Sequence, residues 1–101
     1  MPQDPSQQHA LGGELISQGR FQEAEACYRR VVEALPEFAE AHANLAFTLY
    51  KQGKVPEAIE RYRRALVLDP AEPVAHCSLG TLLKQQGRLE EAISHFREAL
   101  V

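Results

Sequence analysis

A period of 34 residues runs through the chain and constrains its fold more than any other feature. The dipeptide Gln-Gly recurs at Gln18-Gly19, Gln52-Gly53 and Gln86-Gly87. Apolar residues recur at the same interval, in the sets Leu11, Leu45 and Leu79; Leu15, Leu49 and Leu83; Ala24, Ala58 and Ala92; and Tyr28, Tyr62 and Phe96. Self-similarity at a fixed period of roughly 20–50 residues indicates a repeat array, in which each unit stacks on the next. The 101 residues therefore hold three units.

Each unit has the pattern of two helices. In the second unit, His42, Leu45 and Leu49 fall at i, i+3 and i+7, which is one stripe of an α-helix. Gly53 suits a left-handed residue that closes this helix, and Pro56 suits the first turn of the next one. No strand pattern is visible, and the connections are short, so consecutive helices form antiparallel hairpins. We expect an all-α fold of six helices, at residues 5–18, 21–34, 39–52, 55–68, 73–86 and 89–101.

Composition is that of an ordinary globular protein, with 45% hydrophobic and 25% charged residues. The net charge of −3 argues against nucleic-acid binding, which usually needs a basic excess. No stretch approaches the roughly 18 apolar residues of a membrane span, and the N-terminus lacks the pattern of a secretory signal. Cys27 and Cys77 have neither metal-ligand nor disulfide-framework spacing. We therefore predict a cytoplasmic protein that contacts neither membrane nor nucleic acid.

The sequence contains no recognisable catalytic motif. There is no nucleophile beside an oriented base, no close pair of carboxylates and no glycine-rich phosphate loop. The pair Gly12-Gly13 lies within a helical stripe and predicts a close packing contact. We predict that the chain is not an enzyme and uses no cofactor.

The spacing of the histidines and charged residues favours structural roles over metal binding or a charged binding surface. His42 and His76 occupy equivalent places one repeat apart, which favours packing over metal binding, and His95 follows Glu91 at a spacing that predicts a surface ion pair. Favourable i, i+4 pairs also predict a self-neutralised outer face; they are Glu25 with Arg29, Glu57 with Arg61 and Glu60 with Arg64.

The repeat pattern resembles the tetratricopeptide repeat family. The residues that carry the resemblance in the second unit are His42, Leu45, Ala46, Leu49, Ala58, Tyr62 and Pro70. The chain divides into a lead-in at residues 1–4 and three repeats. The repeats span residues 5–38, 39–72 and 73–101, and the third is incomplete at its C-terminus. The usual tryptophan of the family is replaced by Gln8, His42 and His76, which predicts looser local packing.

This resemblance implies a right-handed α-solenoid whose concave groove binds an extended peptide or a partner helix. Helical periodicity places the groove on one face of the first helices: His9, Ala10, Gly13 and Ile16; Glu40, Ala43, Asn44, Phe47, Tyr50 and Lys51; and Val74, Cys77, Ser78, Thr81, Lys84 and Gln85. Within this set, the candidate partner-binding residues are Asn44, Phe47, Tyr50, Lys51, Ser78, Thr81 and Lys84.

Two ligand classes known in the family can be compared with this groove. Some members hold the terminal carboxylate of a chaperone tail with Lys, Arg and Asn. The matching positions here are His9, Gly13, Asn44, Val74 and Ser78, so only Asn44 agrees. The repeats are also similar to those of O-linked N-acetylglucosamine transferases, whose asparagines bind a polypeptide backbone. Asn44 matches one such position, while Ala10 and Ser78 occupy the neighbouring ones.

The sequence stops within the second helix of the third repeat, with no capping helix. Ile93, Phe96 and Leu100 would offer a face for a further hairpin or for a second copy of the chain. Three functions are therefore open. The first is a non-catalytic scaffold that binds a protein or peptide in its groove. The second is a self-assembly element that forms a homo-oligomer through its last helix. The third is a targeting domain of an attached enzyme such as a glycosyltransferase.

Overall fold

Six helices form the described part of the chain, and no strand occurs there. The computed structural model describes residues 4–87 and 89–100, without the side chains of residues 73, 74, 89, 90, 92 and 100. The helices are α1 (Pro5–Ser17), α2 (Phe21–Ala34), α3 (Ala39–Lys51), α4 (Val55–Leu68), α5 (Pro73–Gln85) and α6 (Leu89–Leu100). Every described helix end lies within one residue of its expected position.

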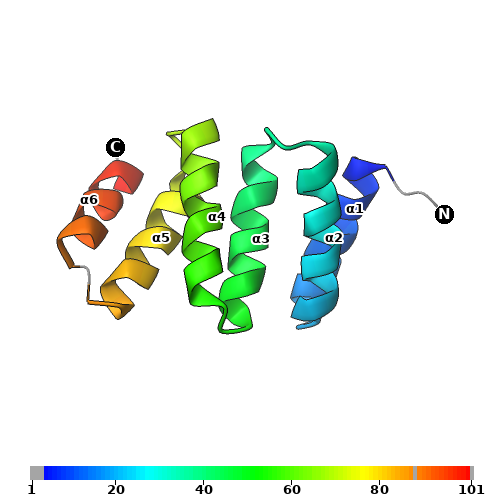
Figure 1. Ribbon diagram of the computed structural model, residues 1–101, viewed down its shortest axis with the longest axis horizontal. Helices are drawn as coiled ribbons and strands as arrows, with labels where there is room; N and C mark the ends of the chain where they lie inside the picture. Colours follow the sequence, from blue (N-terminus) through cyan, green and yellow to red (C-terminus); the bar gives the residue numbers. More distant parts are fainter. Residues whose placement is uncertain (1–3, 88, 101) are drawn as a thin grey trace.

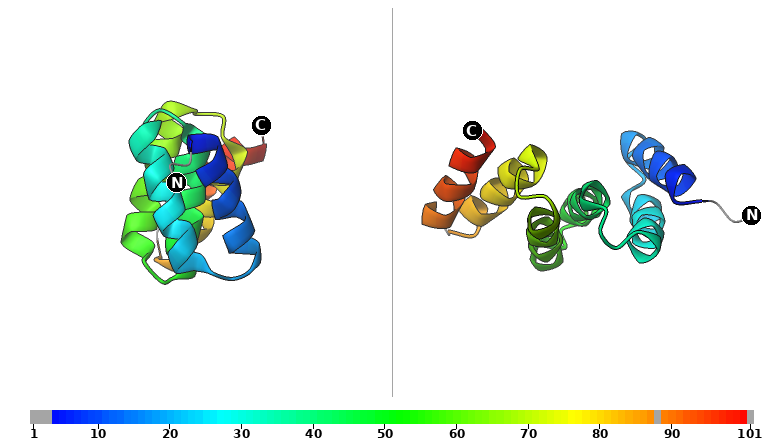
Figure 2. Two further views of the ribbon diagram at one scale, coloured as in Figure 1. Left: turned by 90° about the vertical axis from the view of Figure 1, so that its right-hand side faces the viewer. Right: turned by 90° about the horizontal axis from the view of Figure 1, so that it is seen from above.

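Three antiparallel hairpins stand side by side along the long axis of the molecule (Figures 1 and 2). The pairs are α1 with α2, α3 with α4 and α5 with α6, and each hairpin contacts the next through α2 against α3 and α4 against α5. The result is an elongated body of 46 × 24 × 19 Å. The helices α3 and α5 also contact each other directly, which places the first helices of successive repeats on one side.

Glycine ends the first helix of each repeat. Gly19, Gly53 and Gly87 have φ values of 75°, 80° and 81°, in the left-handed region that other residues disfavour. After α1, the Gly19 N–H donates to the Ile16 carbonyl and the Arg20 N–H donates to the Leu15 carbonyl. This pair of bonds is a Schellman motif, which satisfies carbonyls at the helix end and turns the chain sharply. The recurring Gln-Gly dipeptide is therefore a turn signal.

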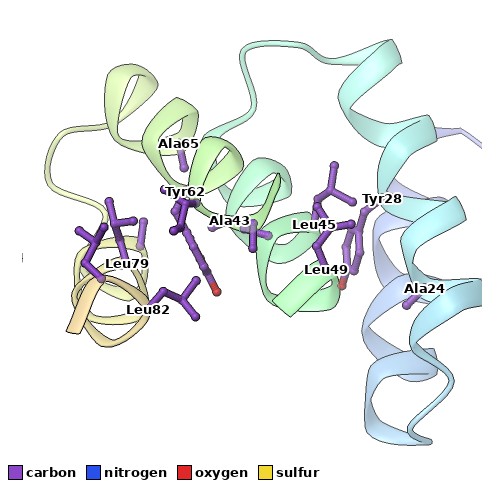
Figure 3. Packing of buried hydrophobic residues seen from close by; sticks show 14 of the residues in the cluster. Ala24, Tyr28, Ala43, Leu45, Leu49, Tyr62, Ala65, Leu79 and Leu82 are labelled. Carbon is purple, nitrogen blue, oxygen red and sulfur yellow. The ribbon is translucent and has the colours of Figure 1, made fainter. Parts of the chain in front are cut away.

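The core combines small residues with large aromatic ones. Tyr28 and Tyr62 are 2% and 1% exposed, and Ala24 and Ala58 are fully buried four residues before them. Leu45, Leu49, Leu79 and Leu83 fill the space between the hairpins without exposure to solvent (Figure 3 draws several of these side chains). At Gly12 the approach is closest, since a Cβ atom there would lie 2.7 Å from Cζ of Tyr28. The absent side chain is what lets α1 pack against the tyrosine ring.

Histidine takes a defined place where the family carries tryptophan. His42 and His76 are 3% and 7% exposed, and Nε2 of each donates to a backbone carbonyl at 2.9 Å. The acceptors are Pro36 and Pro70, in the loops between repeats. The two rings therefore anchor equivalent loops between the repeats.

The adjacent glycines of α1 provide a matched test of this packing. We expect Gly12→Ala to lower the free energy of unfolding by about 1 kcal/mol, because overpacking against Tyr28 outweighs the gain in helix propensity. Gly13→Ala should raise it by about 0.5–1 kcal/mol, since its Cβ would meet only the Tyr28 hydroxyl at an ordinary 3.8 Å. Urea unfolding of both variants measures the difference. Equal effects of the two substitutions would contradict the proposed contact.

Candidate groove along the first helices

Two hollows lie on the face shared by α1, α3 and α5. The first hollow, between α1 and α3, has a volume of about 510 Å³ and is lined by His9, Ala10, Gly13, Ile16, Tyr28, Ala43, Asn44 and Phe47. The second hollow, between α3 and α5, has a volume of about 110 Å³ and is lined by Phe47, Tyr50, Tyr62, Ser78, Thr81 and Leu82. Phe47 lines both hollows, so they adjoin at this side chain and together form a strip across the three repeats.

Five of the seven predicted partner-binding residues line these hollows. They are Asn44, Phe47, Tyr50, Ser78 and Thr81. Lys51 and Lys84 line neither hollow and are exposed near the C-terminal ends of α3 and α5. Val74, which the sequence also placed on this face, has a side chain outside the described part of the structure.

Asn44 is linked across the first hollow to α1. Its Nδ2 lies 3.0 Å from Nε2 of His9, and the amide must donate because a carboxamide nitrogen cannot accept. The His9 ring also packs edge-on against Tyr28 and lies at a tilt over Phe38, with ring centroids 5.5 and 5.2 Å apart. The bond to His9 fixes the orientation of the Asn44 carboxamide. The carboxamide oxygen is the hydrogen-bond acceptor of this side chain.

Lys51 lies over two aromatic rings of α3. Its Nζ is 5.5 Å from the ring centroid of Phe47 and 5.9 Å from that of Tyr50. Cation–π attraction of this kind favours an ammonium group at the face of a ring. Both rings line the second hollow, so Lys51 is the positive charge in contact with its aromatic wall.

Tyrosine hydroxyls from the second helices reach the same face, which the sequence analysis did not predict. Tyr28 lines the first hollow and Tyr62 the second, although both emerge from the core. Figure 3 shows Tyr62 extending from α4 with its hydroxyl oxygen at the tip, on the side of Leu82. Burial raises the pKa of both phenols above the ordinary value, so the hydroxyls stay protonated in neutral solution. The spacing of 34 residues between these tyrosines was the feature of the sequence that could have indicated their equivalent positions.

The outer face carries ion pairs that connect repeats. Glu25 is 12% exposed and accepts bonds from Arg29, Gln52 and Lys54 at 2.8, 2.8 and 3.1 Å. Burial alone would raise the pKa of Glu25, but these bonds outweigh it and lower the pKa. The predicted pair of Glu25 with Arg29 is confirmed.

Two further glutamates form their shortest ion pairs with arginines of another helix. Glu57 accepts from Arg29 at 2.9 Å rather than from its own helix. Glu91 accepts from Arg63 at 2.6 Å, while His95 lies 4.0 Å from it. The predicted contact of His95 with Glu91 is therefore present, although each of the two residues also has a nearer partner.

His95 also faces His76, with the two Nδ1 atoms 3.0 Å apart. Because Nε2 of His76 donates to Pro70, its Nδ1 accepts and that of His95 donates. Among the described residues, no group of three or more His, Cys, Asp or Glu side chains could hold a metal ion.

The last helix presents part of the face that the sequence suggested for self-association. Ile93 is 42% exposed, whereas Phe96 is partly buried and packs against the core cluster. Leu100 lies outside the described side chains. Within the described residues, no helix has the length and apolar character needed to cross a membrane.

Comparison with known proteins agrees with this architecture. The family model described as "Tetratricopeptide repeat" matches residues 9–73 and 44–101, so the chain belongs to the tetratricopeptide repeat family. No curated protein sequence matches the chain.

Solved structures that are similar to the chain include two that cover nearly all of it. One is the second tetratricopeptide repeat domain of Spaghetti (RPAP3) bound to the HSP90 peptide SRMEEVD. Its TM-score is 0.92 at 28% identity, with 97% of this chain and 91% of that chain covered. The crystal structure of MamA has a TM-score of 0.89 at 24% identity and shows the fold alone. That alignment covers 95% of this chain, which spans 56% of the MamA chain.

Histidine burial predicts how stability changes with pH. Burial lowers the pKa of His42, against the hydrogen bond to Pro36, and burial with His76 nearby lowers that of His95. The unfolded chain therefore binds more protons below the ordinary pKa of about 6.5, so stability falls as the pH drops from there. We expect His42→Gln to flatten the fall in the free energy of unfolding between about pH 6.5 and 5.5. Chemical denaturation at several pH values measures the slope, and identical slopes would contradict this explanation.

Proposed function

We propose that this chain is a non-catalytic scaffold that binds an extended segment of a partner protein along the strip formed by the two hollows. The observation that carries the proposal is that the two hollows adjoin at the shared side chain of Phe47, on the face of α1, α3 and α5. A strip of this shape suits a peptide that spans successive repeats. Its apolar walls favour association, and its few polar groups fix orientation and register.

Asn44 gives the strip a group suited to a peptide backbone. A carboxamide offers both a donor and an acceptor, as a backbone requires. Its donor is held by His9 in the free chain, so binding either uses the oxygen alone or exchanges the bond to His9. Because exchanging one hydrogen bond for another changes little free energy, this contact contributes more to specificity than to affinity.

The similar RPAP3 domain supports a peptide as partner, since it was solved with an HSP90 peptide. The groove of this chain differs from a clamp for a terminal carboxylate, because Gly13 and Ser78 occupy positions where the family places longer polar or basic side chains. Recognition of an internal segment therefore fits these residues better than recognition of a chain end.

Self-assembly is the second candidate, favoured by the 42% exposure of Ile93 on the last helix. The partial burial of Phe96 limits the apolar area that this face offers. The third candidate, a targeting domain of an attached glycosyltransferase, rests on Asn44 and the resemblance of the repeats. Both are compatible with a peptide in the groove.

A double substitution in the strip tests the leading proposal. We expect Asn44→Ala with Tyr50→Ala to weaken binding of fluorescent amidated heptapeptides, selected from a random library on the unmodified chain, by about tenfold. Fluorescence polarisation measures the affinity, and circular dichroism checks that helicity is unchanged.

The matched control is Arg61→Ala with Arg64→Ala, because these residues line a separate hollow with Glu57 and Glu60 on the outer helix α4. The control should keep full affinity. Equal affinities of the groove variant and the unmodified chain would refute the groove as the binding site.

A further inference from the structure

We propose that the second hollow binds an acidic side chain of the partner peptide, with the Tyr62 hydroxyl donating to its carboxylate. This inference rests on the proposed function and adds the chemistry of one contact. It concerns an internal Glu or Asp side chain rather than the carboxylate at a chain end.

The Tyr62 hydroxyl is buried, and Ser78, the polar group beside it, does not meet standard hydrogen-bond geometry. The residue is 1% exposed, and its oxygen has no partner of standard geometry among the described residues, although Ser78 lies beside it in the same hollow. A buried polar group without a partner is costly, and native proteins contain few of them. A ligand atom in the second hollow can supply the hydrogen bond that the Tyr62 hydroxyl lacks.

The hydroxyl groups of the hollow differ in their availability. Thr81 donates to the backbone carbonyl of Cys77 at 3.0 Å, so its hydrogen is already used. Tyr62 keeps its hydrogen, because burial raises the pKa of the phenol, an effect that Ser78 opposes only in part. The hollow therefore offers a donor, and an ionised carboxylate is a group that only accepts.

Charge favours a carboxylate over a neutral acceptor. Lys51 lies over the rings of Phe47 and Tyr50, both of which line the second hollow. It forms no ion pair among the described residues. Hydrogen bonds to ionised acceptors are roughly twice as strong as those to neutral ones. The ammonium group and the phenol therefore favour an acid over the corresponding amide.

The size and walls of the hollow favour a short side chain. Its volume of about 110 Å³ is small beside the volume of about 510 Å³ of the first hollow. The rings of Phe47 and Tyr50 and the side chain of Leu82 provide apolar contact for a methylene stem. Glutamate combines such a stem with the carboxylate, so we expect it to be preferred.

The test uses amidated heptapeptide libraries in which one residue is fixed and scanned through each of the seven positions. On the unmodified chain, we expect Glu or Asp to be selected at one position over Gln, Ala and Leu. Tyr62→Phe should lower the affinity of the best acidic peptide about tenfold or more and remove that preference. The same substitution should raise the midpoint of thermal unfolding by about 4 °C, because it removes the buried unpartnered hydroxyl.

Tyr28→Phe is the matched control, since it removes the corresponding hydroxyl from the first hollow. It should leave the acidic preference intact, whereas Lys51→Met should reduce discrimination between Glu and Gln. Selection of Leu or Gln instead of an acid, or an acidic preference that survives Tyr62→Phe, would overturn this inference while leaving groove binding in place. If no library peptide bound the groove, the proposed function would fail as well.

Discussion

The packing of a tyrosine ring beneath the first helix of a repeat is the contact on which both the core and the groove depend. At Gly12 the ring of Tyr28 comes so near that a Cβ atom would lie 2.7 Å from Cζ. The same tyrosine carries its hydroxyl through the hairpin to the first hollow. Tyr62 occupies the equivalent place one repeat later and reaches the second hollow. One residue type therefore supplies apolar burial and a polar group at the candidate site.

Local signals made the fold predictable from the sequence. Gly19, Gly53 and Gly87 adopt φ values that few other residues tolerate, so they end helices wherever they follow an apolar stripe. A proline such as Pro56 sets the start of a helix in the same local way. The family model and the similar structures confirm the architecture of three helical hairpins. Because these signals act over a few residues, they needed no knowledge of the tertiary structure.

The candidate site was less predictable because it depends on side chains that meet across repeats. Helical periodicity placed Asn44 and Phe47 on the groove face, but it could not show that His9 binds the Asn44 amide from 35 residues away. Periodicity placed Tyr62 among the apolar residues of its helix, because it gives the direction in which a side chain points. It could not show that the long side chain extends through the core as far as the second hollow. The ion pair between Arg29 and Glu57 was missed for a related reason, because it joins two hairpins rather than two turns of one helix.

Chemical-shift mapping of a bound peptide tests the central claim of groove binding most directly. The experiment titrates the ¹⁵N-labelled chain with a heptapeptide selected from the random library and follows the backbone amides. Groove binding predicts that the largest shifts fall in α1, α3 and α5, around the residues that line the two hollows. Shifts concentrated in the outward turns of α2 and α4, with those around Asn44 and Phe47 unchanged, would contradict it.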